Sequence, residues 1–153
     1  MQRKRLLIVD DDQALLRMLG RALEREPYEV RCEPSGERAL ALLQEEVFDV
    51  VITDLMLGTT SGFDILRVAK AVSPQTEVIV ITGHGTVDTA VQAMKHGAFD
   101  YITKPVDIEE LSLTVQKACE RQHLVAEVTK LRSQIKDYSR LENIVAASPA
   151  MQQ

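Results

Sequence analysis

Val50-Val51-Ile52-Thr53-Asp54 is a short run of β-branched apolar residues that ends on an aspartate. A strand with apolar side chains on both faces is typical of a parallel sheet that helices cover on both sides. A charged residue directly after such a strand lies at the carboxyl edge of the sheet, where open α/β folds bind their ligands. On this stretch alone, a simple turn at Asp54 is an equal alternative.

Strand and helix patterns alternate five times along the chain. The predicted strands cover residues 6–9, 28–32, 48–53, 78–81 and 99–103. Ser35 is a predicted N-cap, Gly97 suits the position after a helix, and Asp107 with Glu110 resembles a capping box. This alternation predicts an α/β fold, a flavodoxin-like (βα)5 doubly wound parallel sheet with strand order 2-1-3-4-5.

Composition limits the class of protein. The 153 residues include 45% hydrophobic and 27% charged residues, and the formal net charge is −5. An acidic chain is not expected to bind nucleic acid directly. Cys32 and Cys119 lack metal-ligand spacing and suit reduced thiols. Because no apolar run approaches the roughly 20 residues of a membrane span and no signal peptide is recognised, we expect a soluble, cytoplasmic protein without a membrane anchor.

Four predicted strands carry a polar or charged residue at their carboxyl ends. These residues are Asp10-Asp11, Asp54, Thr82 and Lys104. In strand order 2-1-3-4-5 the first and third strands are neighbours, so three carboxylates converge on one crevice. Carboxylates so near to one another need a counter-cation if all are to stay ionised, and oxygen ligands suit Mg²⁺. A carboxylate beside Mg²⁺, a lysine and a hydroxyl is a suitable phosphoryl acceptor.

The chain resembles the receiver domains of two-component response regulators over about residues 4–120. The motifs that carry the resemblance are Leu7-Ile-Val-Asp-Asp-Asp12, Asp54-Leu-Met with Gly62 eight residues on, Thr82-Gly-His-Gly85 and Lys104-Pro105. The resemblance implies that a sensor histidine kinase phosphorylates Asp54 and that the protein is a regulatory phosphoacceptor rather than an enzyme. At most, it would phosphorylate itself slowly from small donors and lose the phosphoryl group slowly.

The same resemblance assigns the remaining site residues. It implies Asp10, Asp11, Asp54 and the backbone carbonyl of Met56 as ligands of Mg²⁺, Thr82 and Lys104 as contacts of the phosphoryl oxygens, and Tyr101 as an aromatic switch. Asp12 lies one position beyond the acidic pair of the family. The Lys104–Pro105 bond is cis in the family. Leu57-Gly58 replaces the usual Met-Pro, which predicts a more flexible polar loop over residues 58–62.

Two segments resemble NtrC-like sigma-54 activators. Residues 82–91 and 98–105 are typical of their receivers, and residues 144–152 are similar to the entry of their central AAA+ ATPase domain. This resemblance implies a receiver domain over 1–120, a linker and dimerisation helix over 121–143, and the start of a truncated ATPase domain over 144–153. The rest of the ATPase and a DNA-binding domain would follow in a longer chain. Without a Walker motif, this piece is not expected to bind ATP.

The segment after residue 120 also has a helical pattern of its own. Apolar residues recur at heptad spacing over about two heptads, at Leu124, Val128, Leu131, Ile135 and Tyr138. A coiled-coil dimer seam is favoured, and a helix that packs on its own domain is the alternative. The family resemblance adds a second dimer surface, formed by the fourth helix, the fourth strand and the fifth helix.

Three other functions compete with the leading hypothesis. An aspartate-nucleophile phosphatase would need a second aspartate two residues after the first, where this chain has Met56. A flavodoxin-like FMN carrier would need a phosphate loop where Asp10-Asp11-Asp12 stands. A stand-alone phosphorelay carrier would lack output domains. His84 and His96 flank the fourth predicted helix without a carboxylate or cysteine cluster in sequence, and His123 lies on the polar side of the tail helix. All three are predicted to be solvated.

Overall fold

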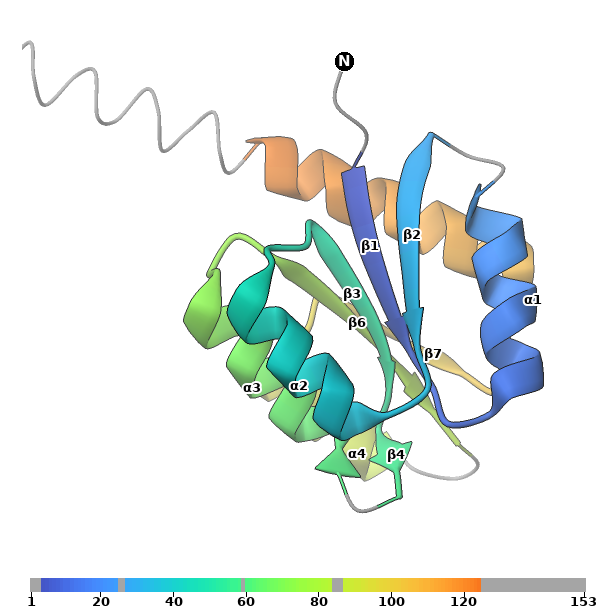
Figure 1. The fold of residues 1–153 in the computed structure, drawn as a ribbon, viewed down its shortest axis with the longest axis horizontal. Coiled ribbons are helices and arrows are strands. Elements are labelled where there is room, and N and C mark those ends of the chain that lie inside the picture. Colours follow the sequence, from blue (N-terminus) through green and yellow to red (C-terminus); the bar gives the residue numbers. More distant parts are fainter. Residues whose placement is uncertain (1–3, 25–26, 59, 84–86, 125–153) are drawn as a thin grey trace, which may run out of the picture. The chain divides into compact units, whose positions relative to one another are not determined.

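The computed structural model describes the chain except residues 1–3, 25–26, 59, 84–86 and 125–153. Its central feature is a parallel sheet in the order β2-β1-β3-β6-β7 (Figure 1). The strands are β1 (Lys4–Val9), β2 (Tyr28–Glu33), β3 (Val50–Asp54), β6 (Glu77–Thr82) and β7 (Asp100–Thr103). Because β6 and β7 are the fourth and fifth predicted strands, the predicted order 2-1-3-4-5 and the doubly wound α/β fold are confirmed.

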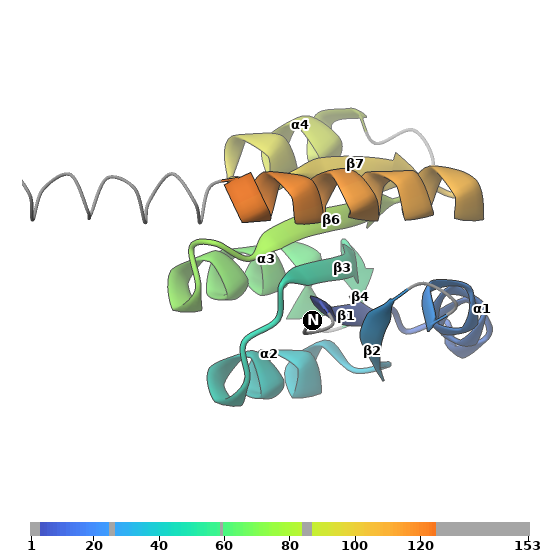
Figure 2. The same cartoon turned by 90° about the horizontal axis from the view of Figure 1, so that it is seen from above.

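Helices cover both faces of this sheet (Figures 1 and 2). They are α1 (Gln13–Glu24), α2 (Gly36–Glu45), α3 (Gly62–Val72), α4 (Val87–Lys95) and a helix over residues 108–124. The buried residues of α1 and of helix 108–124 share one core cluster, and those of α2, α3 and α4 share the other. The first and last helices therefore lie on one face, and the three middle helices lie on the other.

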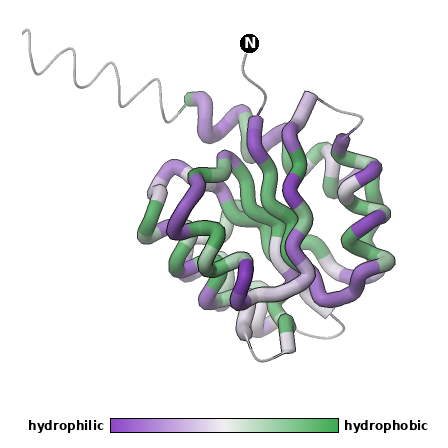
Figure 3. Tube along the Cα trace, in the orientation of Figure 1, coloured by the Kyte–Doolittle hydropathy of each residue, from purple (hydrophilic) through white to green (hydrophobic). Residues whose placement is uncertain are grey.

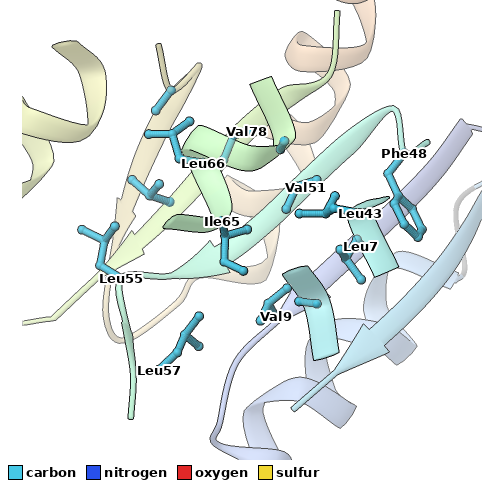
Figure 4. Packing of buried hydrophobic residues seen from close by; sticks show 14 of the residues in the cluster. Leu7, Val9, Leu43, Phe48, Val51, Leu55, Leu57, Ile65, Leu66 and Val78 are labelled. Atoms are coloured by element: carbon cyan, nitrogen blue, oxygen red, sulfur yellow. The ribbon is translucent and has the colours of Figure 1, made fainter. Parts of the chain in front are cut away.

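The core follows from the alternation of side chains along the strands. Leu7, Val9 and Val51 point to the face of α2 and α3, where they meet Ile65 and Leu66 (Figure 4). The residues between them in β1 and β3 point to the opposite face, and these are Leu6, Ile8, Val50 and Ile52. All residues of β3 are buried, and hydrophobic residues concentrate along the central strands (Figure 3).

The predicted helix ends are largely present. Ser35 accepts a hydrogen bond from the Arg38 N–H as N-cap of α2, and Gly97 has a positive φ of 101° after α4. Asp107 accepts hydrogen bonds from the backbone N–H groups of Glu109 and Glu110, which is the N-cap half of the predicted capping box. These bonds satisfy donors that a helix leaves open in its first turn.

The prediction of a polar loop over residues 58–62 is wrong. The segment forms a small antiparallel hairpin of β4 (Met56–Leu57) and β5 (Thr60–Ser61), and α3 begins directly at Gly62. Gly58 adopts a positive φ of 73°, which glycine tolerates at a tight turn. Leu57 and Thr60 are buried against the start of α2, since a Cβ atom on Gly36 would lie 2.7 Å from the Thr60 Cβ. The hairpin therefore has its own packing partner, which a count of polar residues does not reveal.

The parts of the chain after the sheet are only partly described. The sheet, helices α1 to α4 and the last helix as far as Gln122 belong to one compact unit, Met1–Gln122. The predicted seam positions from Val128 to Tyr138 and the predicted ATPase entry over 144–153 lie outside the described residues. In the described part of the chain, no helix combines the length and the apolar character needed to cross a bilayer.

Gly62 provides a test of the packing below Asp54. Its backbone N–H donates to the Leu55 carbonyl, and a Cβ atom there would overlap the Asp54 carbonyl oxygen and lie 2.7 Å from the Leu55 Cα. We expect Gly62→Ala to reduce the free energy of unfolding by about 1–3 kcal/mol, because the overlap forces the backbone to shift. Chemical denaturation measures this change.

The matched control is Gly83→Ala, since a Cβ at Gly83 meets no atom of the described residues within 4 Å and its φ is not positive. Equal effects of the two substitutions would contradict the packing argument.

Candidate functional site

Four strand ends meet at the carboxyl edge of the sheet. Asp10 directly follows β1, Asp54 ends β3, Thr82 ends β6, and Lys104 directly follows β7. Strand pairing sets their proximity, because Val9 is opposite Thr53, Asp54 is opposite Ile81, and Thr82 is opposite Thr103. The edge therefore gathers charged and polar groups that are far apart in the sequence.

Asp10, Asp11 and Asp54 form an acidic cluster at this edge. Each offers a carboxylate oxygen, and these oxygens lie within 4.8 Å of one another. Asp10 is fully buried and Asp54 is 4% exposed, whereas Asp11 is exposed. Such a set of oxygen donors suits a hard cation such as Mg²⁺, and the exposed Asp11 leaves the cluster open to solvent on one side.

Asp10 has one satisfied oxygen and one that is not. Its Oδ1 accepts a hydrogen bond from the Asp12 N–H at 2.8 Å, but no hydrogen bond reaches the buried Oδ2 from the described residues. Burial raises the pKa of the Asp10 carboxyl, and the neighbouring charge of Asp54 raises it further. A buried carboxylate oxygen without a donor is costly, and a bound cation would remove that cost. The cluster therefore fits a divalent metal ion.

Lys104 is the cation that the structure places in the cluster. Its Nζ donates a hydrogen bond to Asp54 Oδ2 at 2.7 Å and lies 3.7 Å from Asp10 Oδ2. Although partial burial acts to lower the pKa of the Lys104 amine, the hydrogen bond to Asp54 and the surrounding carboxylates raise it overall. Lys104 is thus a charged ammonium at neutral pH. The Lys104–Pro105 bond is cis, as the family resemblance implied.

The other oxygen of Asp54 is held by the backbone. Asp54 Oδ1 accepts a hydrogen bond from the Met56 N–H at 3.0 Å, and the Leu55 N–H donates to the Ile81 carbonyl at 3.1 Å. Both carboxylate oxygens therefore have fixed positions. Sequence reasoning missed the Met56 N–H, because any residue but proline supplies such a donor and only the backbone conformation after β3 aims it.

Two predicted site residues lie outside the buried cluster. Tyr101 lies on β7 opposite Val80 and is 43% exposed, so its ring is at the surface. Met56 is 77% exposed, so its side chain is not among the buried carboxylates, and only its backbone is close to Asp54. This exposed thioether side chain also offers no general acid at the position where an aspartate phosphatase needs one.

Asp12 has a structural role that the sequence analysis did not assign. Its Oδ1 accepts hydrogen bonds from the backbone N–H groups of Ala14 and Leu15, at 3.1 Å and 3.2 Å, as the N-cap of α1. An aspartate directly before a run of apolar residues at helical spacing is the signal that could have found it.

The two histidines that the structure describes, His96 and His123, take no part in the acidic cluster. His96 is exposed and makes an edge contact with the Phe63 ring, and His123 is exposed on helix 108–124. The prediction for His84 lies outside the described residues.

Comparison with known proteins agrees with this geometry. The family model of the response regulator receiver domain matches residues 6–116. The alginate biosynthesis transcriptional regulatory protein AlgB of Pseudomonas aeruginosa is 39% identical over 147 residues, a match that covers 96% of this chain and 32% of AlgB. The chain thus spans about a third of the length of the curated relatives it matches.

Solved structures of receiver domains are also similar to this chain. A response regulator receiver domain protein from Clostridium thermocellum has 39% identity and a TM-score of 0.76, over 80% of this chain and 98% of that one. The beryllofluoride-activated NtrC4 receiver domain dimer has 36% identity and a TM-score of 0.72, over 77% of this chain and 98% of that one. The chain belongs to the response-regulator receiver domain family, and its relatives are NtrC-like regulators of the sigma-54 type.

Proposed function

We propose that this chain is a phosphate-operated switch in which Asp54 accepts a phosphoryl group from a sensor histidine kinase with Mg²⁺ as cofactor. The observation that carries the proposal is the position of the Asp54 carboxylate. It is buried between the Lys104 ammonium and the Met56 N–H, and it lies beside Asp10 and Asp11. The chain is then a regulatory phosphoacceptor and not an enzyme with a substrate of its own.

Phosphoryl transfer requires little covalent chemistry from the protein. An Asp54 oxygen attacks the phosphorus of a phosphohistidine, the phosphorus–nitrogen bond breaks, and the electron pair stays on the imidazole nitrogen, which takes up a proton. Lys104 holds phosphoryl oxygens through its ammonium group, and the Thr82 hydroxyl donates to another. Asp10, Asp11, Asp54 and the Met56 carbonyl would hold Mg²⁺, which would supply electrostatic stabilisation of the transferring group.

The new charge would then change a surface. Thr82 and Tyr101 belong to neighbouring strands, since β6 pairs with β7. A Thr82 hydroxyl drawn toward the phosphoryl group leaves space into which Tyr101 repacks. The exposed Tyr101 ring has room for this movement, whereas fully buried side chains do not. The face of α4, β6 and β7 would thereby change its preferred partner.

The proposed output lies in a longer chain. We assign the receiver to residues 1–120, the linker and dimerisation helix to 121–143, and the entry of an AAA+ ATPase domain to 144–153, in a cytoplasmic protein. The fraction of AlgB that is covered, and its name as a transcriptional regulatory protein, support this arrangement. A stand-alone phosphorelay carrier is the alternative, and the sequence that follows residue 153 distinguishes the two.

Asp54→Asn tests the acceptor. We expect wild type to take up a phosphoryl group from acetyl phosphate with Mg²⁺ and the variant to take up none. The neutral amide of the variant lacks the charged carboxylate oxygen that attacks the phosphorus. Intact mass spectrometry measures the uptake. Asp12→Asn is the matched control, since it is exposed and an amide preserves an N-cap. Equal uptake by Asp54→Asn and wild type would refute the assignment of Asp54.

Asp10→Asn tests the metal site. Without divalent cations, we expect this variant to gain about 1–3 kcal/mol in free energy of unfolding, because a buried charged oxygen without a donor becomes an amide N–H₂ that can donate to nearby carboxylates. Since the pKa of folded Asp10 is raised, protonation stabilises the wild-type fold at low pH, and this stabilisation is lost as pH rises through that pKa.

Chemical denaturation measures the free energy of unfolding of both proteins. Measurements without Mg²⁺ over a range of pH give the pH dependence, and measurements at neutral pH with and without Mg²⁺ give the effects of the substitution and of the metal ion. Wild type should gain stability with Mg²⁺ by mass action, and Asp10→Asn should gain much less. A variant that is less stable than wild type without Mg²⁺, or that gains equally from it, contradicts the proposed site.

Two surfaces could hold a homodimer. Exposed apolar side chains lie on α4, β7 and helix 108–124, among them Val91, Met94, Tyr101 and Leu113. The predicted linker seam is the second surface. We expect beryllofluoride to change the sedimentation coefficient of wild type, and either Leu113→Glu or Leu131→Glu to abolish the dimer in the state that forms it. Met18→Glu, on the exposed side of α1, is the control. Dimers that survive both substitutions exclude these surfaces.

A further inference from the structure

The opposite edge of the sheet carries a second polar cluster. Strands whose carboxyl ends bear site residues have polar residues at their amino ends: Lys4 starts β1, Asp49 directly precedes β3, and Glu77 starts β6. Helix 108–124 brings Arg121 and Gln122 to this edge. None of these residues takes part in the proposed phosphoryl chemistry.

Gln122 occupies a position where the helix pattern calls for an apolar residue. The buried residues Leu111, Val115 and Ala118 follow helical spacing along the inner face of the helix, and Gln122 is next in that series. Gln122 is itself buried, with 8% exposure. A buried amide is costly unless its donors and acceptor are bonded, so its presence here requires partners in fixed positions.

Those partners lie at the amino ends of two strands, β1 and β3. The Gln122 Nε2 donates to Asp49 Oδ1 at 3.1 Å and to the Asp49 carbonyl at 3.3 Å. The Gln122 Oε1 accepts a hydrogen bond from the Lys4 Nζ at 2.7 Å. One side chain of the helix is therefore bonded to the beginning of β1 and to the residue before β3.

Asp49 is itself held firmly. Its Oδ2 accepts a hydrogen bond from the Arg5 N–H at 2.7 Å, and its N–H donates to the Arg5 carbonyl at 2.8 Å. Its carbonyl also accepts from the Glu77 N–H at 3.1 Å. Asp49 thus connects β1, β6 and the helix, and each of its carboxylate oxygens has a separate donor.

Arg121 adds a second connection. Its Nε lies 3.3 Å from Glu77 Oε2, and its guanidinium lies over the Phe99 ring at 5.7 Å. Glu77 is buried, and Lys70 lies 3.5 Å from its other oxygen. Because the Arg121 side chain is 58% exposed, this ion pair contributes less than the buried bonds of Gln122.

We propose that Lys4, Asp49 and Gln122, together with the Arg121–Glu77 pair, form an amino-edge clamp that fixes the end of helix 108–124 to the sheet and so sets where the following chain leaves the domain. An apolar residue at position 122 could bury its surface at several helix rotations. A bonded amide is satisfied at one rotation only, so the clamp specifies position more than it adds stability. This inference does not depend on phosphorylation of Asp54.

An exchange of hydrogen-bonding roles tests the clamp in the full 153-residue chain. Gln122→Glu keeps the size and the helix propensity of the side chain but places a carboxylate against that of Asp49. We expect amide hydrogen exchange of residues 119–124 to accelerate roughly tenfold, since a bond to a charged group is lost. Adding Asp49→Asn should restore most of the protection, because the new amide N–H₂ donates to the new carboxylate while its oxygen accepts from the Arg5 N–H.

The matched control is Glu120→Gln, the reverse substitution on the exposed side of the same helix, which should leave exchange of residues 119–124 unchanged. Exchange in β3 and β6 reports global stability and should be preserved in all variants. The clamp is refuted if Gln122→Glu leaves residues 119–124 protected, if exchange accelerates equally throughout the sheet, or if Asp49→Asn brings no recovery. Phosphoryl uptake from acetyl phosphate should stay at the wild-type level in every variant.

Discussion

The mutual repulsion of the carboxylates of Asp10, Asp11 and Asp54 is the constraint on which this structure depends. Strand pairing forces these groups together, since β1 lies beside β3 over four paired residues. The part-buried ammonium-to-carboxylate bond between Lys104 and Asp54, 2.7 Å long, offsets part of the repulsion as a charge-assisted hydrogen bond. One cation cannot balance three acidic groups, so the site retains negative charge. That residual charge is the physical basis of the proposed metal affinity and of the proposed response to a phosphoryl group.

The central strands of the sheet are rigid. Every residue of β3 and β6 is buried, and close-packed strands have little freedom to shift. We therefore expect a change of charge at the carboxyl edge to move side chains that are not closely packed. Tyr101 lies at such a place, because β7 is the edge strand and its outward ring is exposed. The strand order thus places the buried strands β3 and β6 inside the sheet and the exposed ring of Tyr101 on its edge strand.

Sequence reasoning predicted the sheet and the site edge because both follow from strand-end residues. Val50 to Asp54 is apolar on both faces, and only a covered parallel sheet accommodates such a strand. It failed at the loop after β3, where Leu57 and Thr60 pack on Gly36 across a large sequence separation. The Met56 N–H and the bonds of Gln122 were also missed. A backbone donor has no sequence signature, and a glutamine in a helix looks solvent-exposed until its neighbours are known.

The two edges of the sheet have opposite requirements. At the carboxyl edge, Asp10 Oδ2 is buried without a hydrogen-bond donor in the described part of the chain, so a bound cation would satisfy it. At the amino edge, Asp49 has a donor for each carboxylate oxygen. The buried Glu77 Oε2 there accepts no hydrogen bond from the described residues, but the charged Arg121 Nε lies 3.3 Å from it. A switch needs both conditions, because a surface can change its partner usefully only if the connection to the rest of the protein stays fixed. If the amino-edge clamp holds the helix while α4 and β7 rearrange, the changed face keeps a defined position relative to the end of the helix at Gln122. Strand β3, with Asp49 before it and Asp54 at its end, is the rigid element that separates the fixed edge from the responsive one.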